Sequence, residues 1–202
     1  FIIPNTPSVW SISKTYLVLG IEHILLGIDH LLFVLALVLI TFGKWRIVKT
    51  ITAFTLAHSI TLSMAALGFV HVPSAPVEAV IALSIVFLAV ELVNYSNGKI
   101  GLTAKNPWIV AFTFGLLHGF GFAGALTEVG LPQVDIPFAL AFFNIGVELG
   151  QLAFVVLLLA VIYMLNKIEF TKKAWVKLAP AYGIGTIAAM WCIERILGFW
   201  QS

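Results

Sequence analysis

The stretch FALAFFNIGVELGQLAFVVLLLAVIYML, residues 138–165, carries a single charged side chain, Glu148. An α-helix needs about 20 mostly apolar residues to cross the hydrocarbon core of a bilayer, where only helices and closed barrels satisfy their own backbone hydrogen bonds. This stretch exceeds that length, and its apolar residues do not alternate as they do in a barrel strand. It therefore predicts a membrane-spanning helix.

The composition of the whole chain agrees with a membrane protein. Of its 202 residues 61% are hydrophobic and only 10% are charged, whereas soluble domains carry roughly a quarter charged residues. This excludes a soluble globule and a nucleic-acid-binding domain. The one cysteine, Cys192, also excludes an internal disulfide and a thiolate metal cage.

Five further apolar stretches of similar length are separated by turn-forming residues. We therefore predict an all-α polytopic membrane protein, one transmembrane domain over residues 1–202. Its six expected spans are Tyr16–Phe42, Ile47–Gly68, Val77–Tyr95, Trp108–Thr127, Phe138–Leu165 and Leu178–Leu197.

The distribution of basic residues predicts the orientation of these spans. Only Lys14 and Arg195 lie outside the first, third and fifth loops and their helix ends. Nine of the eleven basic residues lie there: Lys44, Arg46, Lys49, Lys99, Lys105, Lys167, Lys172, Lys173 and Lys177. The positive-inside rule then places both chain termini outside the cytoplasm, in a multi-pass plasma membrane protein of the bacterial inner membrane. Because the chain begins at Phe1, we also expect a removed signal peptide or a trimmed chain.

Ionisable residues inside the expected spans are the feature of the sequence that indicates a function. A charge at the middle of a bilayer costs about 2.5–3.5 kcal/mol, so such groups are expected to have partners or to line a water-filled cavity. If depth in the bilayer is counted at ~1.5 Å per residue from the centre of each span, polar groups from four spans lie at the same depth. Imidazole with carboxylate is a ligand set for nickel, zinc, cobalt or iron. The predicted metal ligands are His23, Asp29, His30, His58, His118 and Glu148. The alternative is a buried polar network that only fixes helix packing.

One carboxylate, Glu22, is expected at the outer mouth of this site, and a second, Glu78, is a candidate for it. Glu22 and His23 lie seven residues before Asp29 and His30, about two turns nearer the outside on a continuous helix. Glu78 begins the third span and belongs either to the same mouth or to a helix N-terminus that favours a carboxylate.

Other polar residues are expected around the site or along its exit. Glu91 is either an exit-side group or an interfacial partner of a loop lysine, and Ser59 bonds either a ligand or its own backbone. Asn144 and Gln151 flank Glu148 and are expected to donate or accept hydrogen bonds that orient the metal ligands. Gly115 and Gly119, four residues apart, predict a close helix approach beside His118.

The run His23-Ile-Leu-Leu-Gly-Ile-Asp29-His30 resembles the motif of a His, five residues and Asp-His in the HupE/UreJ family of hydrogenase and urease accessory membrane proteins. The likeness extends through the segments around His58 and His118 and from Phe143 to Gln151. It implies a nickel permease of about six spans, often made with a cleaved signal peptide. It also implies hydrogenase or urease maturation machinery as a partner.

One segment departs from the pattern of the nickel branch, which reads Phe-His-Gly-x-Ala/Val-His-Gly-x-Glu. Here Leu117 to Ala125 keeps His118 and Gly119, but Phe122 stands at the second His position and Ala125 at the Glu position. The chain is more similar to the broader second branch of the family.

The leading interpretation is a transporter or permease for a divalent metal ion, nickel first and zinc or cobalt next. The ion and the lipid bilayer are the expected partners, and the oligomeric state is not predicted. An intramembrane zinc-dependent hydrolase is the alternative, since histidines and a carboxylate hold zinc and activate water. A metal sensor or a structural partner of another membrane complex is the third interpretation.

Overall fold

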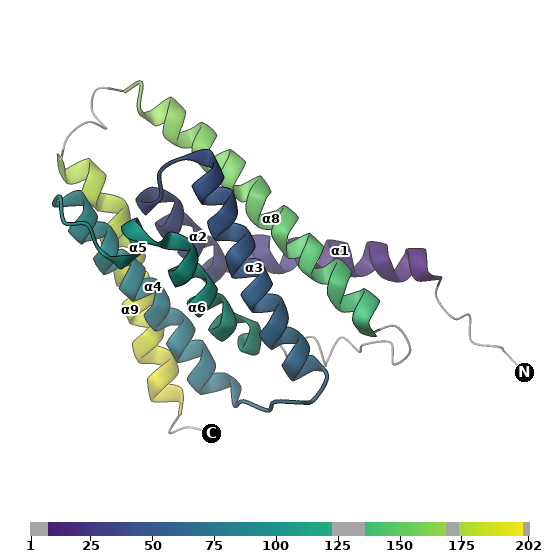
Figure 1. Ribbon diagram of the computed structural model, residues 1–202. Coiled ribbons are helices and arrows are strands. Elements are labelled where there is room, and N and C mark those ends of the chain that lie inside the picture. The colour runs from purple at the N-terminus through teal and green to yellow at the C-terminus, as the bar shows by residue number, and fades with distance from the viewer. Residues whose placement is uncertain (1–7, 123–135, 169–173, 200–202) are drawn as a thin grey trace, which may run out of the picture.

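The structure is a computed structural model that describes residues 8–122, 136–168 and 174–199. Every regular element within these ranges is a helix, which confirms the all-helical prediction there. Figure 1 shows the helices in order: α1 (Val9–Leu26), α2 (Ile28–Ile40), α3 (Lys44–Ala66), α4 (Ser74–Ser96), α5 (Leu102–Lys105), α6 (Pro107–Gly121), α8 (Ile136–Leu165) and α9 (Ala174–Gly198).

Several of these helices have the length and composition of membrane spans. α1, α3, α4 and α8 are long and apolar enough to cross a bilayer, and α2 and α6 are shorter apolar helices. α9 has the length but also contains Pro180, Glu194 and Arg195. The part of the predicted fourth span beyond Phe122 lies outside the described residues. The count of six spans stays a prediction.

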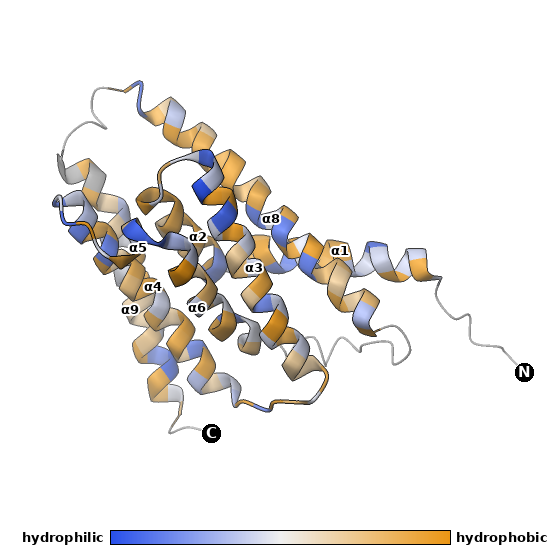
Figure 2. Cartoon of the chain, viewed as in Figure 1, coloured by the Kyte–Doolittle hydropathy of each residue, from blue (hydrophilic) through white to orange (hydrophobic). Residues whose placement is uncertain are grey.

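The surface of the bundle is also that of an integral membrane protein. Val156, Leu157 and Met164 of α8 are between 62% and 68% exposed, and Figure 2 shows α8 as mostly hydrophobic along its length. Large exposed apolar surfaces are rare on soluble monomers and mark interaction or membrane-facing regions. We therefore treat these side chains as lipid-facing.

The first predicted span is not one continuous helix, which corrects the expectation from the sequence. It begins earlier, at Val9, and breaks at Gly27 between α1 and α2. A Cβ atom on Gly27 would lie 2.7 Å from the carbonyl oxygen of His23 and 2.9 Å from Nδ1 of His30. A side chain does not fit there. Non-helical backbone at membrane depth is tolerated where protein or a cavity surrounds it.

Glycines bring the helices that carry the histidines into close contact. On α6, a Cβ atom at Gly115 or Gly119 would overlap the backbone of α3 at Phe54 or His58. On α8, a Cβ atom at Gly146 would overlap the carbonyl oxygen of Leu17 in α1. The close approach predicted from Gly115 and Gly119 is confirmed, and it sets the turn of α6 that carries His118 against the turn of α3 that carries His58.

The helix ends that flank the loops rich in basic residues share one end of the bundle. Arg46, at the start of α3, donates hydrogen bonds of 3.0 Å to the carbonyl oxygens of Ala104 and Lys105 at α5. The C-terminal end of α8 and the N-terminal end of α9 lie at this same upper end in Figure 1. We call it the basic end.

Candidate metal site

Four histidines from four helices form one cluster inside the bundle. His23 lies in the last turn of α1 and His30 in the first turn of α2, while His58 and His118 come from α3 and α6. The ring centroid of His30 lies 4.7 Å from that of His23, 5.9 Å from that of His58 and 5.2 Å from that of His118. The centroids of His23 and His58 are 5.9 Å apart. We call these four residues the histidine cluster.

The break at Gly27 explains why His23 belongs to this cluster. In a continuous helix, seven residues would separate His23 from His30 by about 10 Å along the axis. The break turns the chain, and the two rings instead lie edge to face with centroids 4.7 Å apart. His23 therefore lies beside His30. The sequence had predicted that it lies two turns nearer the outside, and that prediction is wrong.

The cluster is buried, and most of its ring nitrogens lack partners. His30, His58 and His118 are at most 5% exposed. Within the described residues no hydrogen-bond partner reaches the following buried atoms: Nε2 of His23, Nε2 of His30, both nitrogens of His58 and Nδ1 of His118. An unpaired buried polar group costs about 1–3 kcal/mol. Five such atoms in one place make the histidine cluster the candidate binding site of the described residues.

The contact between Ser84 and His118 determines which nitrogen of His118 is free. The Ser84 hydroxyl donates to the carbonyl oxygen of Ile81 at 2.6 Å, and its oxygen lies 3.1 Å from Nε2 of His118. Because the hydroxyl proton is already used, the oxygen accepts a hydrogen bond from Nε2–H. The neutral ring then has its lone pair on Nδ1, the atom without a partner.

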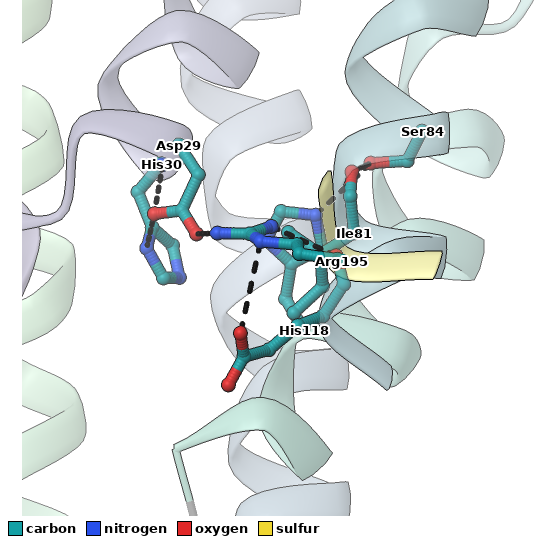
Figure 3. A network of polar contacts seen from close by, with 7 residues as sticks. Asp29, His30, Ile81, Ser84, His118 and Arg195 are labelled. Carbon is teal, nitrogen blue, oxygen red and sulfur yellow. Dashed lines mark hydrogen bonds and ion pairs between the residues drawn. The ribbon is translucent and has the colours of Figure 1, made fainter. Parts of the chain in front are cut away.

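Asp29 orients His30 in the same way. The Oδ1 atom of Asp29 accepts a 2.9 Å hydrogen bond from the backbone N–H of His30 and lies 3.2 Å from Nδ1 of the same residue. Nε2 of His30 is thereby left as the free ring nitrogen. Figure 3 shows the carboxylate between His30 and Arg195 of α9, whose Nη2 atom lies 3.7 Å from Oδ2. Histidines that bind metals usually donate their other N–H to such a group.

A cavity opens onto one side of the cluster. It has a volume of about 340 Å³ and is lined by Leu19, Glu22, His23, Leu26, Gly27, Phe122 and Phe143. Glu22 is exposed at this cavity, and the ring of Phe122 lies 3.8 Å from that of His23, centroid to centroid. Of the described helices, α1, α6 and α8 therefore form an approach to His23 that contains one carboxylate.

The structure places Glu148 apart from the histidines. Its Oε1 atom accepts a 2.6 Å hydrogen bond from the Thr52 hydroxyl, and Gln151 accepts one of 2.9 Å from the Thr55 hydroxyl. Thr55 and Thr52 lie three and six residues before His58 on α3, toward the basic end. We call Thr52, Thr55, Glu148 and Gln151 the α3–α8 polar seam.

The remaining predicted residues have local partners. The Ser59 hydroxyl donates to the carbonyl oxygen of Thr55, and the Asn144 amide donates to that of Leu140, each within its own helix. Glu91 accepts a 2.8 Å hydrogen bond from the backbone N–H of Thr103 at α5. It lies seven residues beyond Ser84 on α4, about 10 Å farther along.

The histidines are close together, but they are not arranged around a common point. Among the described residues, no three His, Cys, Asp or Glu side chains stand as a ready metal-binding group. Four imidazoles at ~2.0–2.1 Å from one tetrahedral ion would have ring centroids roughly 5 Å apart. Four of the six ring pairs, those of His30 with the other three histidines and that of His23 with His58, have centroids 4.7–5.9 Å apart.

Sequence reasoning missed two residues that contact the site, Ser84 and Arg195. Ser84 is an ordinary serine in an apolar span and gave no signal. Arg195 had one, because it is one of only two basic residues outside the basic loops and their helix ends. Glu78, a candidate for the mouth from the sequence, is a neighbour of Arg195, with 3.6 Å between its Oε2 atom and Nε of the arginine.

The fold and the site define an integral membrane protein with a cluster of histidines among its spanning helices. Residues 3–195 match the family model described as HupE / UreJ protein, and the chain belongs to the HupE/UreJ family. No curated protein and no solved structure matches the chain.

Proposed function

We propose that the protein is a permease for a divalent transition-metal ion, with nickel as the ion. The observation that supports this most is the set of unpartnered ring nitrogens in the histidine cluster. Ser84 and Asp29 fix the tautomers of His118 and His30 so that a lone pair remains on each ring. Imidazole nitrogen suits nickel, zinc, copper and iron. The choice of nickel rests on what resemblance to the HupE/UreJ family implies.

The ion enters through the cavity beside Glu22 and His23. A carboxylate at a cavity mouth attracts a dication, and His23 connects this cavity to the cluster. The four histidines then bind the ion, while Asp29 holds His30 in place. Protons compete with metal ions for imidazole nitrogens, so uptake should weaken as the external pH falls.

The ion leaves along the α3–α8 polar seam toward the basic end. Thr55 with Gln151 and Thr52 with Glu148 place oxygen atoms between two helices whose other contacts are largely apolar. Polar groups inside membrane spans commonly mark ion pathways. With the basic end in the cytoplasm of a bacterial cell, the direction is inward, and hydrogenase or urease maturation is the consumer that the resemblance implies.

A hydrolase is less well supported by the same contacts. A serine nucleophile needs a base that accepts its proton, but the Ser84 proton is held by the carbonyl oxygen of Ile81. Glu148, a residue suited to activate a water molecule, is bonded to Thr52 in the α3–α8 polar seam. Transport requires neither Ser84 nor Glu148 to give up its hydrogen bond.

Uptake of radiolabelled Ni²⁺ into proteoliposomes tests the proposal, with Co²⁺ and Zn²⁺ as competitors. We expect saturable uptake above that of empty liposomes, and its loss in His118→Ala. Absence of transport of all three ions by folded protein in sealed vesicles would exclude the permease.

A further inference from the structure

Arg195 forms a bridge between two carboxylates, Asp29 beside His30 and Glu78 of α4. Its Nη1 atom donates a 2.8 Å hydrogen bond to the backbone carbonyl oxygen of Glu78, and its Nε atom lies 3.6 Å from Oε2 of the same residue. Its Nη2 atom lies 3.7 Å from Oδ2 of Asp29. One guanidinium of α9 thus contacts α4 and α2 at once (Figure 3).

The two acids differ in their surroundings but share this cation. The side chain of Asp29 is 22% exposed and that of Arg195 is 23% exposed, whereas Glu78 is 47% exposed. Among the described residues, the ion pairs of these two acids are with Arg195 and, for Asp29, also with His30. Arg195 is therefore the permanent positive charge at this position.

The charge balance has a consequence for a dication. The carboxylates of Asp29 and Glu78, the guanidinium of Arg195 and four neutral imidazoles together carry a charge of −1, which becomes +1 when a divalent ion binds. Without the guanidinium the same groups carry a charge of −2, which becomes zero when the ion binds. Opposite charges attract more strongly where water is partly excluded, so the arginine lowers the affinity of the site for a dication.

We propose that Arg195 is a built-in counter-charge, which holds Asp29 and Glu78 in the absence of metal and competes with the ion for their charge. This inference rests on the proposed function, because it concerns the same site. A transport site must bind an ion firmly enough to accept it and weakly enough to release it. Arg195 sets that balance and favours release.

The test is the affinity of the purified full-length chain for Ni²⁺, measured by titration calorimetry in detergent. Arg195→Gln should tighten binding by about tenfold, equivalent to about 1.4 kcal/mol. Glu78→Gln removes an anion and should weaken binding severalfold. The double variant should lie between the two single variants, close to the wild type. Arg195→Lys, which keeps the charge, should bind less tightly than Arg195→Gln.

A structural role for Arg195 predicts the opposite sign. If the arginine only positioned Asp29, Arg195→Gln would weaken Ni²⁺ binding, and that result would overturn the inference, as would an unchanged affinity. If Arg195→Gln does not fold, Glu78→Gln carries the test, and an affinity of Glu78→Gln equal to or above that of the wild type overturns the inference. A wild-type chain that binds no Ni²⁺, Co²⁺ or Zn²⁺ would instead refute the proposed function.

A second measurement separates affinity from turnover. At saturating Ni²⁺, proteoliposomes with Arg195→Gln should take up the ion several times more slowly than the wild type, because release becomes limiting. Faster uptake together with tighter binding would contradict a role in release.

Discussion

His30 is the centre of the site at the scale of single residues. It contacts each of the other three histidines, and its interplanar angles with them are 68°, 80° and 75°. Its own Nδ1 faces Asp29, so a single free nitrogen, Nε2, remains for a ligand. Removal of this ring should therefore affect binding more than fold.

We predict that His30→Ala abolishes binding of Ni²⁺ to the purified protein. The matched control is His71→Ala, because His71 is an exposed histidine in the loop after α3 and should bind Ni²⁺ as the wild type does. The measurement is metal content after equilibrium dialysis, together with circular dichroism to verify the helices. Equal loss in both variants would show that the cluster is not the binding site.

Ser84→Ala should weaken metal binding by about 10–100-fold, which is the usual effect of removing a group that orients a metal-binding histidine. The hydroxyl holds Nε2–H of His118, and without it the ring is free to change tautomer. Ser59→Ala is the control, since the bond of the Ser59 hydroxyl within the described part of the chain is to the carbonyl oxygen of Thr55. Calorimetric titration with Ni²⁺ measures both variants, and comparable affinities for the two would refute the role of Ser84.

Depth counting along the sequence placed His30, His58 and His118 at one level, but it placed His23 two turns away and did not predict the contact of Ser84 with His118. A buried imidazole is costly wherever it lies in a span, so its type and position are informative. Ser84 is different, because a serine in a membrane helix is satisfied by its own backbone. Whether it also meets His118 depends on how α4 is rotated against α6. That rotation is set by packing over both helices and is not encoded in any short pattern.

At the scale of helices, the site depends on close packing at glycines and on one break. Gly115 and Gly119 predicted the approach of α6 to α3, because glycines four residues apart leave a flat helix face. The break at Gly27 was not predicted. Glycine is common in unbroken membrane helices, so its presence alone does not indicate where a helix ends. The close contact of Gly27 with His23 and His30 is a property of the folded chain.

Gly119→Ala should destabilise the protein by about 1–3 kcal/mol, the usual cost of overpacking, because its Cβ atom would overlap Thr61 Oγ1 and the His58 carbonyl oxygen. Gly183→Ala in α9 is the control, since a Cβ atom there meets nothing within 4 Å. It should instead stabilise the helix by about 0.5–1 kcal/mol. Thermal unfolding in detergent measures both changes. A Gly119→Ala variant as stable as Gly183→Ala would mean that α3 and α6 are not in close contact.

At the scale of the whole molecule, charge is distributed unequally between the two ends. Arg46 connects the start of α3 to α5, and the exposed Lys99 lies in the loop that leads into α5. The opposite end holds the exposed His71 and the partly exposed Glu78. A membrane potential of 100 mV acts on each charge with about 2.3 kcal/mol, so a cluster of cations resists export. The structure gives the two ends, and the charges predict which one is cytoplasmic.

Labelling of single cysteines tests this orientation in intact cells. We begin with Cys192→Ser, which removes the one native thiol, and add either His71→Cys or Lys99→Cys. Both positions are exposed, in the loops at the two ends of the bundle. A membrane-impermeant maleimide should label the thiol at position 71 in whole cells and the thiol at position 99 only after permeabilisation. The reverse pattern would place the basic end outside, and Ni²⁺ would then have to enter the site from the α3–α8 polar seam instead of the cavity beside Glu22.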